Sequence, residues 1–369
     1  LTLHQMQRYA EAVPLFEEAV REARAIGNRI NEAKALLGLG QTLQALGEDQ
    51  NARLRLQESL ALSQAMSVRE TEWRSLYALA QVELKAGRQS EAIDLLSRAV
   101  QAIEGMRADL KIDQLKEGFI TNKMAVYETL VGVLVDRGQT VEAFDMAERS
   151  RARNFIDLLG NQRLSLRSTV EEALYARQLT LRTRILEHEA LVAQAIEAVE
   201  RTAYQEALAR LNDAYGDLML EIQLKNPQLA AVVSVNPLTV DQVRSLVEPG
   251  VALLTYYVLP RETLCWIVTS GGIELVRTSV DRDLLNQTVF DYRRRIQNLE
   301  PLEGPSRQLF DWLLGPVMPR LAESAYLGII PHGSLHYLSF ATLSDGSRFL
   351  IDQLPLFYLP SASAVSYTH

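Results

Sequence analysis

The chain is poor in cysteine, with one residue, Cys265, in 369. A single cysteine excludes an intrachain disulfide framework and any zinc site built from several cysteines of one chain. This composition suits a reducing compartment, so we expect a cytoplasmic protein. Long apolar runs are also missing, because none approaches the roughly 18 residues that a membrane span needs. No membrane partner is therefore expected.

Basic residues are in deficit, with 38 Lys and Arg against 46 Asp and Glu and a net charge of −8. Nucleic-acid-binding domains usually carry a basic excess, so no nucleic-acid partner is expected. The hydrophobic fraction of 47% is ample for packed cores and excludes a mainly disordered chain. At roughly 100–200 residues per domain, the length allows two or three domains.

A repeat with a period of 40 residues runs through the first part of the chain. Small and large residues recur at matched positions, Gly47, Ala52, Leu56 and Ser59 in one copy and Gly87, Ala92, Leu96 and Ala99 in the next. The leucines before Gly47 recur at spacings of three and four, which is one face of a helix. We therefore predict two helices per repeat, with Gly47 and Gly87 in the turns between them. A further copy around Gly138 and Ala143 follows an insertion.

This pattern of small and large residues in helix pairs resembles the tetratricopeptide (TPR) repeat, and its period resembles the longer variety seen in kinesin light chains. The resemblance covers residues 1–160. It implies an α-helical superhelix that binds a protein or peptide on its concave face.

In the TPR family the first helix of each pair lines the concave face, which here gives helices at about 31–46, 70–86 and 123–137. Their core stripes include Leu39 and Leu79, so partner contacts are expected on the other faces. The candidates are polar, with amide and cationic groups: Asn31, Lys34, Gln41, Arg74, Gln81, Lys85, Asn122 and Lys123. Such groups suit an extended, partly acidic segment. An ordinary solvated surface is the alternative at each position.

Residues 141–160 form an amphipathic helix in which Arg149, Arg151 and Arg153 lie close together. Either a solvated face or a basic groove for an acidic segment fits them. Residues 161–236 are predicted to be a long helical hairpin or coiled-coil connector, because apolar stripes run between Glu, Arg, Gln and Ala. His188 and Glu189 begin an HExxH motif, but Val192 stands where the second histidine must be. No metal and no cofactor are therefore expected.

The character changes over residues 237–369, where short apolar runs alternate with turn residues. We predict strands at 251–259, 264–268, 273–276, 326–331, 335–338 and 354–359. Helices are predicted at about 282–299 and 306–323. Strands, then helices, then strands indicate an α/β domain that is incomplete at residue 369.

Two segments in this part are similar to hallmark segments of the CHAT domain. One is Ile329–Ala341, with the sequence IIPHGSLHYLSFA, and the other is Leu354–Ser363, which ends in YLPSAS. Residues 143–160 resemble the junction between TPRs and CHAT in such proteins. Ser339 stands where the family usually has a structural proline. The resemblance implies a caspase-like fold, a bacterial source and, in active members, a cysteine peptidase with a Cys–His dyad.

The dyad segments of the family follow the stretch that ends at Ser363, so neither dyad residue is assigned in this chain. The chain begins with Leu1 and ends at His369, and we expect it to be a piece of a longer polypeptide. Cys265 lies inside a predicted strand, where a free cysteine is usually a small buried residue. His332 and His336 flank a turn and receive no catalytic role.

Two functions remain open. In one, the chain is the sensor and the front of a TPR-regulated cysteine peptidase, inactive by itself. In the other, it is a non-catalytic interaction scaffold that uses the concave TPR face. The occupant of that face is a partner protein or the missing remainder of the parent.

Overall fold

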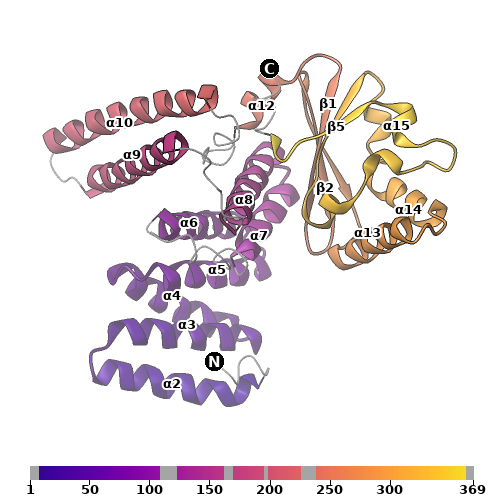
Figure 1. Cartoon of the computed structure of the whole chain (residues 1–369). Helices are drawn as coiled ribbons and strands as arrows, with labels where there is room; N and C mark the ends of the chain where they lie inside the picture. Colours follow the sequence, from indigo (N-terminus) through magenta and orange to yellow (C-terminus); the bar gives the residue numbers. More distant parts are fainter. Residues whose placement is uncertain (1–7, 109–122, 162–168, 195–197, 226–237, 363–369) are drawn as a thin grey trace. The chain divides into compact units, whose positions relative to one another are not determined.

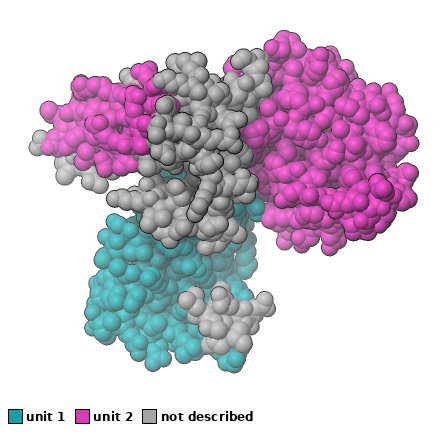
Figure 2. Space-filling view, in the orientation of Figure 1, with its two compact units in different colours: residues 1–137 teal, residues 138–369 magenta. Residues whose placement is uncertain are grey.

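The computed structural model describes residues 8–108, 123–161, 169–194, 198–225 and 238–362. Two compact units divide the chain, residues 1–137 and residues 138–369 (Figures 1 and 2). The first unit is helical, and the second combines helices with a small mixed sheet. This confirms the predicted fold class, helical repeats followed by an α/β domain.

The first unit consists of successive helices. They are α2 (Tyr9–Ala25), α3 (Arg29–Ala45), α4 (Asp49–Ala65), α5 (Arg69–Lys85), α6 (Gln89–Ala108) and α7 (Met124–Asp136). Of these, α2 to α6 are joined by tight turns. Each helix packs against the next, and α3 also contacts α5. Helix pairs therefore repeat along the unit, as the period of 40 residues predicts.

The turns use a left-handed residue at regular intervals. Gly27, Gly47 and Gly87 have φ angles of +69°, +83° and +75°, and Ser67 takes the equivalent place with +54°. After Gly47, the N–H of Glu48 donates to Leu43 O at 2.9 Å, which closes the end of α3. The prediction that Gly47 and Gly87 lie between helices is confirmed.

Small residues occur where two helices approach closely. A Cβ atom on Gly40 would lie 2.6 Å from Leu56 Cγ, so α3 and α4 meet at a position that only glycine fits without a shift. The Ser59 hydroxyl donates to Ala33 O at 2.8 Å and lies 2.9 Å from the Ser75 hydroxyl. The recurring small and large residues thus mark the contacts within the helix array.

The second unit begins with three long helices, α8 (Thr140–Asn161), α9 (Thr169–Gln194) and α10 (Ala198–Lys225). Helices α9 and α10 pack against each other, with an ion pair of 3.0 Å between Arg177 and Glu221. They form the helical hairpin expected from the apolar stripes.

The sheet has five strands in the order β3-β2-β1-β4-β5. They are β1 (Val251–Val258), β2 (Thr263–Thr269), β3 (Gly272–Thr278), β4 (Tyr326–Ile330) and β5 (Leu356–Tyr358). Strands β1, β2 and β3 are antiparallel neighbours, whereas β4 runs parallel to both β1 and β5. The accompanying helices are α12 (Val240–Leu246), α13 (Arg282–Gln297), α14 (Glu303–Leu313) and α15 (Leu350–Gln353).

The central strands are buried on both faces. Tyr256 and Cys265 lie on the face whose core includes residues of α13 and α14. Tyr257 and Trp266 are their neighbours along the strands and therefore point to the opposite face. An apolar run without alternation is what a strand covered on both sides requires.

Two predicted elements differ from the structure. Residues 335–338, expected as a strand, belong to the 3₁₀ helix Gly333–Tyr337 and its end. Leu335 and Leu338 are both buried, because a spacing of three places them on one side of a 3₁₀ turn. The helix predicted at 306–323 is shorter, since α14 ends at Leu313 and only a 3₁₀ turn, Met318–Arg320, follows.

Candidate functional site

The polar face predicted on α3 and α5 is accessible in the structure. Lys34 and Gln41 on α3 lie 40 residues before Arg74 and Gln81 on α5, so the two pairs hold equivalent places in successive repeats. Lys34 and Gln81 are exposed, and Gln41 and Arg74 are partly exposed. Helices α3 and α5 contact each other, and each carries one cationic and one amide side chain of this set.

The remaining candidates have different surroundings. Asn31 is exposed at the start of α3, where its backbone N–H donates to the Asn28 side chain at 3.0 Å. Lys85 is exposed and already paired, since its Nζ lies 2.7 Å from Asp49 Oδ2. Lys85 therefore offers less free charge to a partner than Lys34 and Arg74.

Lys123 is buried, with 3% of its surface exposed, so the expectation that it lies on the binding surface is wrong. Its Nζ lies 3.7 Å from Glu70 Oε2 and 5.3 Å from the centre of the Trp73 ring. Burial lowers the pKa of the Lys123 amine, although Glu70 opposes this effect. The sequence carries no sign of this packing, because Trp73 lies on another repeat. Asn122 lies outside the described residues.

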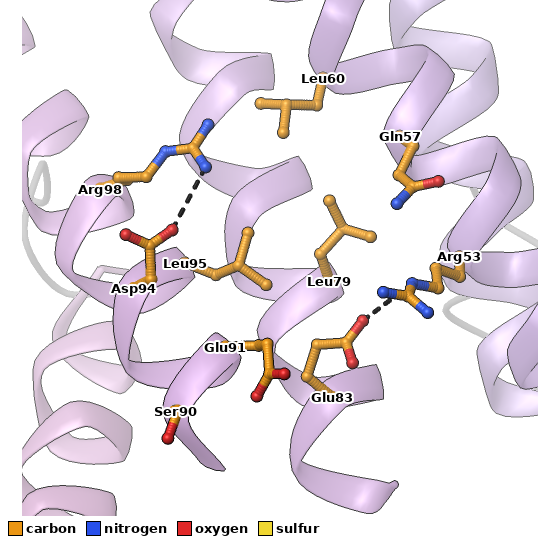
Figure 3. Close-up of a pocket in the computed structure, with 10 residues that line it drawn as sticks. All are labelled: Arg53, Gln57, Leu60, Leu79, Glu83, Ser90, Glu91, Asp94, Leu95 and Arg98. Atoms are coloured by element: carbon orange, nitrogen blue, oxygen red, sulfur yellow. Dashed lines mark hydrogen bonds and ion pairs between the residues drawn. The ribbon is translucent and has the colours of Figure 1, made fainter. Parts of the chain in front are cut away.

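A groove of about 510 Å³ lies between α4, α5 and α6 (Figure 3). Its lining residues are Arg53, Gln57, Leu60, Leu79, Glu83, Ser90, Glu91, Asp94, Leu95 and Arg98. None of the eight predicted contact residues is among them. On α5 the groove uses Leu79 and Glu83, which point away from Arg74, Gln81 and Lys85 because α-helical residues turn by about 100° each.

In the second unit, α8 packs against the sheet and α12 through one aromatic contact and two hydrogen bonds. The Phe144 ring packs edge-on against Trp266 with ring centres 5.9 Å apart, and Trp266 Nε1 donates to Thr140 O at 3.2 Å. Asp145 Oδ1 accepts the N–H of Val240 at 2.9 Å, at the first turn of α12. Helix α8 thus covers the face of the sheet opposite to α13 and α14. The division between the units falls after Arg137, rather than at the boundary of 160 expected for the repeats.

Helix α8 carries a buried ion pair between Glu148 and Arg151. Glu148 is fully buried, accepts a hydrogen bond from Arg151 Nη1, and accepts the N–H of Ala362 through Oε2 at 2.8 Å. Arg151 is 4% exposed and donates through Nη2 to the carbonyl oxygen of Tyr256. Two interpretations were open for the arginines of residues 141–160, a solvated face or a basic groove. For Arg151 both are wrong, because its side chain is buried. Arg149 is exposed.

His332 lies at the C-terminal end of β1, close to the Tyr256 carbonyl oxygen that Arg151 binds. Its Nδ1 accepts the N–H of Val258 at 3.1 Å, and its ring stacks on Tyr257 with centres 4.3 Å apart. Arg282 Nη2 donates to the carbonyl oxygen of Val258 at 3.1 Å. Burial and then the charge of Arg151 lower the pKa of His332 well below its usual range, so the ring is neutral and its Nε2 carries the proton.

Cys265 and His332 do not form a nucleophile–base pair. Cys265 is paired in register with Tyr256, whereas His332 stacks on Tyr257, which points to the other face of the sheet. Burial raises the pKa of the Cys265 thiol far above its usual range, so the thiolate that attacks a substrate is disfavoured.

The described residues contain no group of three His, Cys, Asp or Glu side chains able to hold a metal ion. None of their helices combines the length and apolarity that crossing a bilayer requires.

Comparison with protein families agrees with this architecture. The tetratricopeptide repeat model matches residues 1–65, and the CHAT domain model matches residues 303–369. The chain has a TPR–CHAT architecture. No curated protein matches it. The match to CHAT includes β4, His332 with the 3₁₀ helix that follows it, and strand β5.

The sequence pattern did not predict the role of α8 in the second unit. Its small residues at 143 and 147 follow the repeat pattern, which predicts a TPR helix. The available signal was the likeness of residues 143–160 to a TPR–CHAT junction. That likeness did not indicate that Glu148 and Arg151 are buried, because their partners lie more than a hundred residues later.

Proposed function

We propose that the TPR–CHAT protein is a protein-interaction module whose helices α3 and α5 bind an extended, partly acidic segment. The observation that carries the proposal is the pair of cations at equivalent places in successive repeats, Lys34 and Arg74. Neither forms an ion pair with a described residue, and each stands seven residues before an accessible glutamine. TPR repeats generally mediate protein interactions, which agrees with this role.

The chemistry of the four side chains suits a peptide backbone. The side chains of Gln41 and Gln81 each offer a donor pair and an acceptor, which match backbone carbonyl and N–H groups. Lys34 and Arg74 supply charge to carboxylates, and charge-assisted hydrogen bonds are roughly twice as strong as neutral ones. An extended chain crossing α3 and α5 meets one cation and one amide on each helix.

The test is capture of an acidic segment by variants of the whole chain. Lys34→Glu/Arg74→Glu should weaken capture by at least about tenfold, roughly 1.4 kcal/mol, because two attractive charges become repulsive. A panel of displayed extended peptides, graded in Asp and Glu content, supplies the probe, and biolayer interferometry gives the affinities. Circular dichroism should be unchanged, since both side chains are accessible. Unaltered capture by this variant would refute the proposed face.

Lys85 supplies an internal comparison. Lys85→Glu places a carboxylate beside Asp49, so some loss of stability is expected together with a smaller loss of capture. Adding Lys85→Glu to the double variant tests whether all three cations act on one ligand. Arg21→Glu, on the exposed surface of α2, is the matched control and should leave capture intact.

Peptidase activity is the alternative that the CHAT resemblance implies, through a Cys–His dyad in a caspase-like parent. The buried thiol of Cys265 and its separation from His332 across the sheet support assigning no catalysis to these residues. We therefore propose binding as the activity of this chain, either as the sensor of a peptidase or as a scaffold.

A further inference from the structure

The groove between α4 and α6 exposes apolar surface inside an otherwise well-packed helix array. Leu60 of α4 and Leu95 of α6 are only partly buried, although both pack against the core that contains Leu79. In Figure 3 the three leucine side chains, one from each helix, converge on the middle of the groove. A volume of about 510 Å³ lies within the range of roughly 300–1,000 Å³ typical of ligand sites.

The charges around these leucines are unequally satisfied. Glu83 is buried and pairs with Arg53 at 3.0 Å and also with Arg88, so this carboxylate is neutralised. Arg98 lies 3.4 Å from Asp94, which is a long contact with the Asp94 side chain 67% exposed. Both lining arginines thus have a carboxylate partner (Figure 3).

Glu91 is the exception among the charged lining residues. It is exposed and forms no ion pair with any described residue. It stands three residues before Asp94, so the two carboxylates lie on the same face of α6. The wall formed by α6 therefore has a net negative charge beside the leucines, with Glu91 and Asp94 against Arg98.

We propose that this groove is a second binding site, which takes a partner segment carrying large aliphatic side chains next to lysine or arginine. The aliphatic groups contact Leu60, Leu79 and Leu95, and the cation faces Glu91 and Asp94. Because the groove and the polar face of α3 and α5 use opposite sides of α5, one repeat can hold two segments of opposite charge. This site is independent of the function proposed above.

The experiment measures binding of three fluorescein-labelled peptides to the full chain by fluorescence polarisation. The peptides share a Leu-x-x-Leu centre and differ in their flanks, which are lysine, serine or glutamate. The lysine-flanked peptide should bind at least about tenfold more tightly than the glutamate-flanked one. Equal binding of all three, or no binding of any, would overturn the proposal.

Variants then locate the binding. Glu91→Lys/Asp94→Lys should reverse the order of the lysine-flanked and glutamate-flanked peptides, and Leu95→Ala should weaken every peptide. Glu91→Gln/Asp94→Asn should remove the preference without reversing it, which keeps the test valid where the lysine variant unfolds. Thermal melting checks each fold.

Two controls distinguish this site from others. Glu18→Lys/Glu22→Lys makes the same charge change on exposed residues of α2 and should leave the order of the peptides unchanged. Lys34→Glu/Arg74→Glu should also leave it unchanged, since those residues do not line the groove. A preference that persists in the Glu91 and Asp94 variants, or that disappears with Lys34 and Arg74, would show that the groove is not the site.

Discussion

At the scale of single residues, side chains provide the hydrogen bonds that backbone groups at the end of β1 do not receive from a neighbouring strand. Strand β4 ends at Ile330, opposite Thr255, whereas β1 continues to Val258. Arg151 binds the carbonyl oxygen of Tyr256, and His332 and Arg282 bind the two polar groups of Val258. Buried backbone groups need such partners, because leaving one unpaired costs about 1–3 kcal/mol.

The role of His332 predicts a pH dependence of stability. Its neutral ring accepts the Val258 N–H, and a protonated ring would also meet Arg151, Arg282 and His336. The pKa of His332 is lowered in the folded chain. Below about pH 6.5 this histidine therefore binds a proton in the unfolded chain but remains neutral in the folded chain. The free energy of unfolding should therefore fall as the pH drops from about 6.5, by up to about 1.4 kcal/mol per pH unit for this group.

Urea titrations between pH 7.5 and 5 measure this slope. His332→Asn keeps an acceptor oxygen near the place of Nδ1 and removes the titration, so its slope should be smaller. His336 contributes in the same direction, because burial lowers its pKa as well, and some slope should remain. His188→Asn on α9 is the control. An unchanged slope in His332→Asn would show that His332 is protonated in the folded protein.

At the scale of secondary-structure elements, α8 is the least expected helix. Its sequence continues the repeat, with small residues at the positions where a TPR helix needs them. Within the second unit, it contacts β1 through Ser150, β2 through Phe144, α12 through Asp145 and the segment after β5 through Glu148. A helix with a repeat-like face therefore serves as one layer of the second unit.

The buried pair on α8 predicts a non-additive mutant cycle. Glu148→Gln should destabilise the second unit by about 3 kcal/mol, because it leaves the buried Arg151 cation unpaired. Arg151→Met should have a cost of similar size, because Glu148 is then buried without its cation and Tyr256 O loses its donor. The double variant should be less destabilised than the sum of the two single variants, since no uncompensated charge remains.

Urea denaturation of the four proteins gives the cycle, and Arg149→Met serves as the exposed control. Strictly additive costs would mean that Glu148 and Arg151 do not interact in the folded state. A cost of Glu148→Gln below about 0.5 kcal/mol, typical of surface changes, would contradict its burial.

At the scale of the whole molecule, the division of the chain after Arg137 is itself testable. A fragment of residues 138–369 keeps Thr140, Phe144 and Glu148 against the sheet, whereas a fragment of residues 161–369 exposes the face that carries Trp266. The first fragment should show near-ultraviolet circular dichroism and a cooperative unfolding transition. The second should lose both and bind the dye ANS. Equal folding of the two fragments would assign α8 to the repeat unit.

Much of the first unit was predictable because its information is local. Helix periodicity, a left-handed residue at each turn and small residues at close contacts all recur at fixed intervals, and each concerns neighbours within about 40 residues. The exposure of Lys34, Gln41 and Gln81 follows from the same helix geometry. Lys123 escaped this reasoning because its burial depends on Trp73 and Glu70 in the preceding repeat.

Local pattern thus accounts for the helix pairs, the strands β1 to β5 and the two families, since hydrophobic period and turn residues act over a few positions. It could not assign α8 to a unit, because a repeat-like face is compatible with either neighbour. Only the folded chain pairs Glu148 with the N–H of Ala362 and Arg151 with Tyr256 O, at separations of 214 and 105 residues. Burying a charged side chain is favourable only when such distant partners meet, and no local pattern encodes that meeting.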